Sequence, residues 1–186
     1  MSPIVLTLQM CLFLLTLPVF VLNVLGLWDI LMKKMFPFIM LHINEMYSKS
    51  MDGIKRDLFS NLSDFENPSK ELNLLEIGCG TGTNFKFYPN GCRITCLDIN
   101  PNFQSYLTKS QVESDHLKFE GFIIASADNM GSVADESMDV VVCTLLVCCV
   151  PNTPKVLEEV QRVLKSPFLF LDKSHFLKKS GRSPFL

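Results

Sequence analysis

The sequence lacks an excess of basic residues, because lysine and arginine number 17 and aspartate and glutamate 19. Proteins that bind the phosphate backbone of nucleic acids use such an excess, so we expect no nucleic-acid partner. The chain also lacks a Cys-x-x-Cys pair, and its seven cysteines do not have the spacing of a disulfide framework. We expect reduced, mostly buried thiols on the cytosolic side of a membrane.

The sequence shows neither a Ser-His-Asp set nor a cluster of metal ligands with credible spacing. We therefore predict no metal site and assign no catalytic residue. His116 and His175 are expected to be surface histidines. Cys143, Cys148 and Cys149 are expected to be packed core thiols near the end of a strand.

Charge is absent from Ile4 to Trp28, where leucine, valine and phenylalanine dominate. A helix of this length can cross a hydrocarbon core about 30 Å thick. A cleaved signal peptide is disfavoured, since the run has no basic segment before it and no small-x-small site after it. We predict a membrane anchor over residues 1–28, with Lys33 and Lys34 placing the following domain in the cytosol. A kink at Pro18 leaves both a span and a hairpin open.

Residues 29–70 mix charged and apolar residues at roughly helical spacing, which predicts a helical connector that covers one face of the domain or the mouth of a ligand site. The turn cluster Glu66–Lys70 marks a domain boundary. The predicted domain then occupies residues 71–172, and residues 173–186 form a tail.

Short apolar runs alternate with helical segments after this boundary. Such an alternation predicts a mostly parallel sheet with helices on both faces, a Rossmann-like α/β fold that binds ligands at the carboxyl ends of its strands. The expected strands are Leu72–Ile77, Arg93–Leu97, Leu117–Ala125, Asp139–Val147 and Phe168–Leu171, and the expected helices are Thr83–Phe87, Phe103–Ser114 and Lys155–Leu164.

A glycine-rich turn follows the first strand, in the order Glu76, Gly78, Gly80 and Gly82. Glycines allow a sharp bend and a close approach of ligand to backbone. Asp98 ends the second strand about twenty residues further on, where an acid reaches a ribose hydroxyl. Because Thr83 stands where a dinucleotide site has its third glycine, the pattern favours S-adenosylmethionine over a nicotinamide cofactor.

The loop after the third strand contains Asn129 and Met130. In such domains this loop covers the adenine ring, where an acid or amide accepts from the exocyclic amine and a methionine packs on the ring. An ordinary helix start capped by Asp128 is the alternative.

The segments LLEIGCGTGTNFKFYPNGCRITCLDINPNF and DVVVCTLLVCCV closely resemble the methyltransferase-like seven family of membrane-anchored thiol methyltransferases. The resemblance covers roughly residues 1–165. It implies a seven-stranded Rossmann-like fold, an anchor in endoplasmic reticulum or lipid-droplet membrane, and methyl transfer from S-adenosylmethionine to small alkyl thiols. Carried over by position, the cofactor-binding residues are Glu76, Gly78, Gly80, Gly82, Asp98, Asn129 and Met130, with asparagine at 129 where the family has aspartate.

The chain departs from the family after Leu164, where the family continues for roughly sixty more residues that include the last strands. We therefore expect a fold that is incomplete at its C-terminal strands. The predicted activity is methylation of a small lipophilic thiol on a membrane that the N-terminal segment binds. The alternative is a catalytically impaired isoform that binds S-adenosylmethionine on the membrane or the lipid droplet, while the oligomeric state is not predicted.

Overall fold

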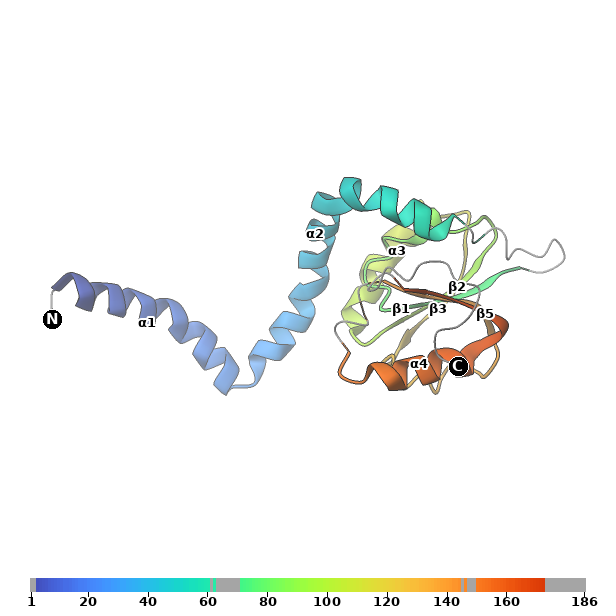
Figure 1. Ribbon diagram of the computed structural model, residues 1–186. Helices are drawn as coiled ribbons and strands as arrows, with labels where there is room; N and C mark the ends of the chain where they lie inside the picture. The colour runs from blue at the N-terminus through green and yellow to red at the C-terminus, as the bar shows by residue number, and fades with distance from the viewer. Residues whose placement is uncertain (1–2, 61, 63–70, 145, 147–149, 173–186) are drawn as a thin grey trace.

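The computed structural model describes residues 3–60, 62, 71–144, 146 and 150–172 of the chain. Two long helices precede a parallel sheet that lies between further helices (Figure 1). The five strands of the described residues are arranged in the order β3-β2-β1-β4-β5, and every neighbouring pair is parallel. They are β1 (Asn73–Ile77), β2 (Arg93–Asp98), β3 (Lys118–Ile124), β4 (Met138–Cys143) and β5 (Leu164–Asp172).

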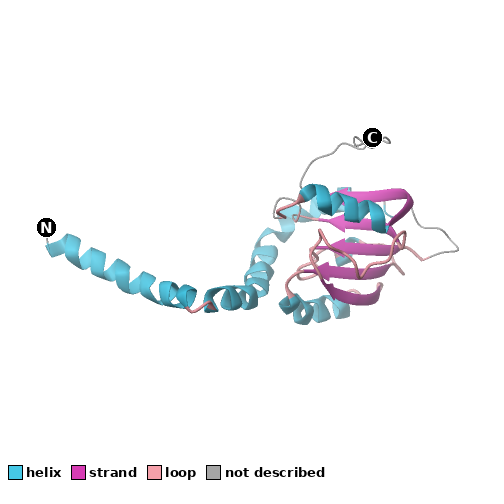
Figure 2. Ribbon diagram, turned by 90° about the horizontal axis from the view of Figure 1, so that it is seen from below, coloured by secondary structure: helices cyan, strands magenta, loops and turns pink. Residues whose placement is uncertain are grey.

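Helices lie on both faces of this sheet, as Figure 2 shows. One face packs against α3 through Leu107 and against the end of α2 through Phe59. The other face packs against α4 through Val156, Val160 and Val163. The Rossmann-like fold predicted from the sequence is thereby confirmed. The helical segments are α1 (Pro3–Val24), α2 (Leu27–Phe59), α3 (Gln104–Glu113), α4 (Thr153–Val163), and the 3-10 turns η2 (Phe85–Phe87) and η3 (Pro101–Phe103).

The strands are buried on both faces because they are almost continuously apolar. Leu74 and Val140 point into the core beneath α3, while Leu75 and Val141, their neighbours along each strand, point into the core beneath α4. Successive side chains of a strand alternate between the two faces, so an uninterrupted apolar run fills both cores. This placement leaves the carboxyl ends of β1, β2 and β4 on one edge of the domain.

One predicted helix is wrong. Residues 83–87 form only the single 3-10 turn η2, in which Tyr88 donates its backbone N–H to the carbonyl of Phe85. The aromatic side chain of Phe85 is buried under the glycine turn, and packing of that side chain holds the segment in a tight turn. The segment after β1 is therefore shorter than a helix of several turns.

Helix α1 is apolar on all sides and extends away from the domain (Figure 1). Residues Ile4–Val24 have a mean hydropathy of 2.4 and none of this segment is buried, so by length and composition it can cross a membrane. The helix continues through Pro18, which lies inside it. The chain turns at Gly26, whose φ of 68° is left-handed and favours glycine.

Helix α2 connects α1 to the domain. It begins beside the turn at Gly26, bends part-way, and lays its last turns across the domain (Figure 1). Phe59 at its C-terminus enters the core, where its ring lies 5.3 Å from the ring of Tyr88. The connector expected over residues 29–70 is thus helical up to residue 59, and the predicted boundary at 66–70 lies outside the described residues.

Candidate functional site

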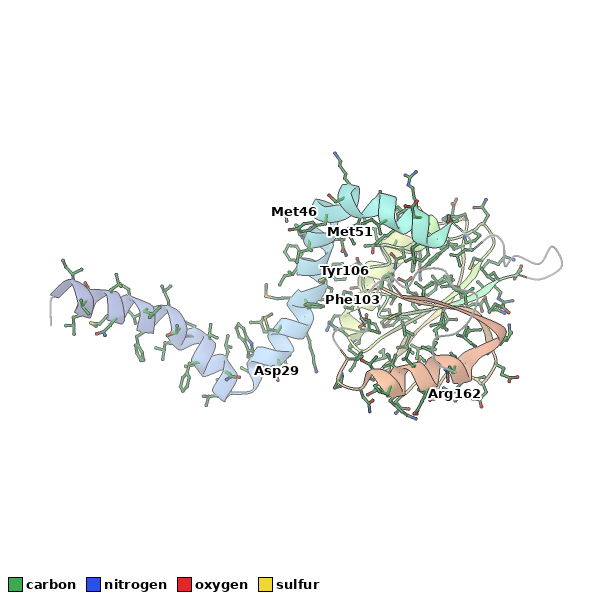
Figure 3. The ribbon with its side chains drawn as sticks, viewed as in Figure 1. Asp29, Met46, Met51, Phe103, Tyr106 and Arg162 are labelled. Carbon is green, nitrogen blue, oxygen red and sulfur yellow. The ribbon has the colours of Figure 1, made fainter. Side chains whose placement is uncertain are left out.

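An open cavity of about 1300 Å³ lies where the carboxyl ends of β1, β2 and β4 meet α2 and α3. Parallel α/β sheets bind ligands at this edge. The glycine turn after β1 forms its floor and α2 forms one wall. Phe103 from η3 and Tyr106 from α3 face α2 across it, whereas Arg162 on α4 lies on the opposite side of the sheet (Figure 3).

The glycine turn has three residues in the left-handed region. The φ angles of Gly78, Gly80 and Gly82 are 68°, 54° and 76°. The N–H of Gly78 donates to the carbonyl of Leu97 at 2.7 Å, which fixes the turn against β2. All three glycines line the cavity, so the structure brings together these residues predicted from the sequence.

Gly82 is the least replaceable of the three. A Cβ there meets the ring of Phe85 at 2.9 Å and Leu107 at 3.1 Å, in addition to the strained φ of 76°. Left-handed strain and overpacking each cost about 1–3 kcal/mol. We expect Gly82→Ala to lower the free energy of unfolding by about 2–6 kcal/mol, measured by urea unfolding of the detergent-solubilised chain. Gly91→Ala is the control and should show the strain alone, since Gly91 has a φ of 77° and a Cβ there would meet no atom within 4 Å.

Asp98 lies at the end of β2 with its carboxylate at the cavity. Its Oδ2 accepts from the N–H of Gly80 at 3.2 Å, and its Oδ1 accepts from the N–H of Asn100 at 2.9 Å. Burial raises the pKa of Asp98, and these backbone hydrogen bonds oppose the rise. Each carboxylate oxygen retains a second lone pair, so the group can still accept from two hydroxyls of a diol.

Glu76 is placed differently from the glycines. Its side chain is 1% exposed and lies beneath the turn, where Oε1 accepts from Asn84 Nδ2 at 2.6 Å and Oε2 accepts from the hydroxyl of Tyr88 at 2.8 Å. Glu76 is absent from the described residues that line the cavity. In this structure the acid therefore holds η2 against the glycine turn.

Burial raises the pKa of Glu76 from 4.5 to about 7, against the hydrogen bonds from Tyr88 and Asn84 that favour the carboxylate. The native state then binds a proton more tightly than the unfolded chain does. The stabilisation of the native state by this tighter proton binding is fully present below about pH 4.5 and is lost as the pH rises through about 7. The difference between the native-state and unfolded-state pKa values of Glu76 corresponds to about 3 kcal/mol of stability.

We therefore expect the wild-type chain to lose up to about 3 kcal/mol of stability between pH 5 and pH 8, relative to the Glu76→Gln variant. A glutamine at 76 can still pair with Asn84. If the side-chain amide of Asn84 rotates, its Oδ1 accepts a hydrogen bond from the side-chain NH2 of the glutamine. Thermal unfolding across this pH range measures the effect. Parallel curves for the two proteins would contradict a raised pKa at Glu76.

The predicted adenine loop is a turn without a helix, so Asp128 does not cap a helix. Asn129 is exposed, and Met130 is completely buried in the core next to α4, where its N–H donates to Glu159 Oε2 at 2.7 Å. Neither Asn129 nor Met130 is among the described residues that line the cavity. The structure thus does not bring these two predicted residues to the glycine turn.

His116 and Cys143 do not line the cavity. His116 is half-buried, and its carbonyl accepts from the N–H of Gly91 at 2.7 Å. Cys143 is buried in the core, as expected, and so are Cys79, Cys92 and Cys96, while Cys11 on α1 is exposed. His175, Cys148 and Cys149 lie outside the described residues. No group of three potential metal ligands occurs within the described part of the chain.

Sequence reasoning missed how closely α2 contacts the glycine turn. Asn44 Nδ2 donates to Thr81 Oγ1 at 3.3 Å, and Lys55 Nζ donates to Thr83 Oγ1 at 3.1 Å. Further out, Asn100 Nδ2 donates to the carbonyl of Lys33 at 2.8 Å. Asn44 and Lys55 are far apart along α2 and form no periodic pattern. The sequence therefore predicted that a helical segment covers the site but not which residues make the contacts.

The cavity fits a nucleoside that carries a polar tail. The glycines leave the backbone open to a ligand, and Asp98 offers a carboxylate to a diol at one end of the turn. At the other end, Asn84 Oδ1 is buried and has no hydrogen-bond partner among the described residues, which leaves an acceptor for a ligand donor. S-adenosylmethionine has both features, in its ribose and its ammonium group.

Comparisons with known proteins agree with this site. Residues 75–167 match the sequence model of a family described as a methyltransferase domain. Over 186 residues the chain is 48% identical to thiol S-methyltransferase TMT1B of Rattus norvegicus, covering all of this chain and 76% of the rat protein. Over 154 residues it is 53% identical to thiol S-methyltransferase TMT1A of Homo sapiens, covering 83% of this chain and 63% of the human protein.

A solved structure shows the same fold. The SAM-dependent methyltransferase from Aquifex aeolicus is similar with a TM-score of 0.50 at 19% sequence identity, covering 69% of this chain and 69% of that chain. The residues matched by the family model run from β1 into β5, and so include the glycine turn and Asp98.

Proposed function

The chain belongs to the methyltransferase-like seven family of S-adenosylmethionine-dependent methyltransferases, and we propose that it methylates small alkyl thiols at the cytosolic face of the endoplasmic reticulum or lipid-droplet membrane. Two relatives carry the name thiol S-methyltransferase, which supports the acceptor class. The observation that carries the proposal is the cavity itself, whose floor is the glycine turn and whose wall is a helix that follows an apolar anchor.

The residues of the turn are proposed to hold the cofactor by its two polar ends. Asp98 accepts from the ribose hydroxyls, and Gly78, Gly80 and Gly82 let the tail lie against the backbone. Glu76 keeps the turn in place from beneath through Asn84 and Tyr88. When bound, S-adenosylmethionine supplies an electrophilic methyl group on a sulfonium sulfur.

The chain contributes to the reaction mainly by orienting the acceptor and excluding water. Holding two reacting groups at about 3 Å in line accounts for much of the rate in reactions of this kind. Met32, Phe36 and Met40 of α2 line the cavity and suit the alkyl part of a thiol. The proposed acceptor is therefore small and lipophilic, and membrane lipid is the proposed partner of α1.

The acceptor thiol must lose its proton before the methyl transfer, because the thiolate is the nucleophile. The cysteine thiol has a reference pKa of about 8.5, and a simple alkanethiol is a weaker acid, so little of the acceptor is ionised at neutral pH. We expect the rate with a simple alkanethiol to rise between pH 6 and pH 8, and to follow ionisation of the acceptor. A series of thiols with different pKa values separates this dependence from ionisation of the protein.

The length of the acceptor tests the apolar wall. Each methylene that leaves water contributes about 0.8 kcal/mol, or about fourfold in kcat/KM, until the cavity is filled. Membranes that carry the full chain are incubated with S-adenosylmethionine bearing a tritiated methyl group and straight-chain thiols of two to eight carbons. We expect kcat/KM to rise about fourfold per methylene over the first members, and no product from the matching alcohols.

The outcome that contradicts the proposal is specific. A chain that binds S-adenosylhomocysteine but methylates none of these thiols would be a membrane-associated S-adenosylmethionine-binding protein, which is the alternative that the sequence left open. Methylation of the alcohols at the same rate would show that sulfur is not the selected acceptor.

A further inference from the structure

Lys55 lies on the inner side of α2, where the helix passes over the glycine turn. Its ammonium donates to Thr83 Oγ1 at 3.1 Å, and its side chain is half-buried and lines the cavity. Thr83 directly follows Gly82 and is the residue that departs from the dinucleotide pattern. A positive charge from the membrane-linked helix is thus placed against the end of the cofactor turn.

The other described lysines around the cavity are placed differently. Lys86 is ion-paired with Asp52 at 2.8 Å, and Lys109 lies 4.0 Å from Glu113 on the exposed side of α3. Lys33 lies near the outer end of α2, where its carbonyl contacts the η3 side of the site. Among these four, Lys55 is the lysine whose ammonium contacts the glycine turn.

Lys55 and Asp98 contact different ends of the glycine turn. Asp98 contacts the turn at Gly80, whereas Lys55 contacts it three residues later at Thr83. The charge of Lys55 also lies close enough to Glu76 to lower the pKa of that carboxyl, against the larger effect of burial. Because Thr83 directly precedes Asn84, the hydrogen bond to Thr83 places the cation at the Asn84 end of the turn.

A ligand whose ribose is held by Asp98 extends its amino-acid tail along the turn toward this side. The tail of S-adenosylmethionine ends in a carboxylate, an anion that needs a cation or several N–H donors when it leaves water. An ammonium has three donors, so Lys55 can keep its hydrogen bond to Thr83 and still donate to a carboxylate. The hydroxyl of Thr83 has its own proton to donate to the same group.

We propose that Lys55, supported by Thr83, binds the carboxylate of the methionine part of the cofactor. The inference rests on the proposed use of S-adenosylmethionine and assigns a residue of α2 to the cofactor site. It makes the helix that follows the membrane anchor a part of that site. A fragment that begins at the sheet would lack this contact.

The test compares two ligands that differ in the carboxylate alone. S-adenosylhomocysteine and its decarboxylated analogue, S-adenosyl-3-thiopropylamine, are titrated by calorimetry into the detergent-solubilised full chain. A charge-assisted hydrogen bond of this kind corresponds to about 10- to 100-fold in affinity. We expect the wild-type chain to prefer S-adenosylhomocysteine by that factor, and Lys55→Met to reduce the preference to less than about threefold.

Two further variants serve as controls for the charge and for its position. Lys55→Arg retains a cation and should keep most of the preference. Lys49→Met removes the same charge from an exposed position of the same helix, outside the cavity lining, and should leave both affinities unchanged. Measuring at one fixed ionic strength removes differences in screening between the titrations.

Three results would overturn the inference. They are a wild-type chain that binds both ligands equally, a Lys55→Met variant that keeps the full preference, and a Lys55→Met variant that loses the same factor for both ligands, which would show that Lys55 only shapes the turn. Failure of the proposed function looks different, because the wild-type chain would then bind neither ligand. If Lys55→Met does not fold, Lys55→Gln is measured in its place, and retention of the full preference by that variant would likewise overturn the inference.

Discussion

Replacing Asp98 with alanine is expected to abolish methyl transfer and to weaken the binding of S-adenosylhomocysteine by more than about 100-fold. Two hydrogen bonds from ribose hydroxyls to a carboxylate contribute about 1.5–3 kcal/mol each, and the variant loses both. It also loses the acceptor for the N–H groups of Gly80 and Asn100, which lie 3.2 and 2.9 Å from the carboxylate oxygens. The measurements are methylation of an alkanethiol by membranes and calorimetric titration of the solubilised chain.

Asp139→Ala is the matched control for this variant. Asp139 also accepts a backbone N–H at a strand end, from Asn73 at 2.9 Å, but it lies at the opposite edge of the sheet, where Lys165 donates to it at 2.8 Å. Its loss should lower stability and leave the affinity for S-adenosylhomocysteine within about threefold. If the two variants lose affinity equally, Asp98 acts through stability and not through the ribose.

The arrangement of the core was predictable because it depends on patterns that are local in sequence. Uninterrupted apolar runs such as that of β4 identify strands buried on both faces, and the clear apolar stripe of Lys155–Leu164 identified α4. The observed ends of the helices and strands differ by a few residues from the predicted ones, because capping residues and side-chain contacts determine where an element ends. Asn152, which accepts from the N–H of Lys155 at 3.2 Å, starts α4 two residues before the predicted start.

The candidate site was predictable in part. The positions of Gly78, Gly80, Gly82 and Asp98 follow from the turn and from the end of the next strand, and the structure brings them to one cavity. The environment of Glu76 was not predictable, because its partners Asn84 and Tyr88 become neighbours only when η2 folds back under the turn. A pattern of spacings identifies which residues follow a strand but not which of them face the ligand.

Helix α2 shows a second limit of the sequence. Its mixture of charged and apolar residues indicated a helical cover, yet contacts such as that of Phe36 with Phe103, with ring centroids 6.0 Å apart, depend on how the helix bends over the domain. The bend and the docking are tertiary effects, so no local pattern encodes them. In the sequence alone, nothing distinguishes Lys55 from an ordinary surface lysine, because its contact with Thr83 forms only when α2 docks on the domain.

Deleting residues 1–25 is expected to move the chain from the membrane pellet to the supernatant after extraction with sodium carbonate. The Leu, Ile, Val and Phe residues of α1 together contribute about 4–8 kcal/mol to insertion, which corresponds to at least about 1000-fold in partition. None of the segment Ile4–Val24 is buried against the protein, so its apolar surface is available to lipid. Full retention of the shortened chain in the pellet would contradict an anchor in α1.

The same deletion separates anchoring from cofactor binding. Because α1 extends away from the domain, whereas the wall of the cavity begins at Met32 in α2, the shortened chain should bind S-adenosylhomocysteine within about threefold of the full chain. Extending the deletion to residue 46 removes Phe36 and Asn44 but keeps Lys55 and Phe59, and should weaken binding by about tenfold or more, since the turn loses the Asn44 contact and the wall that keeps water out. Equal affinities for the two deletions would show that the first half of α2 serves only to connect the anchor to the domain.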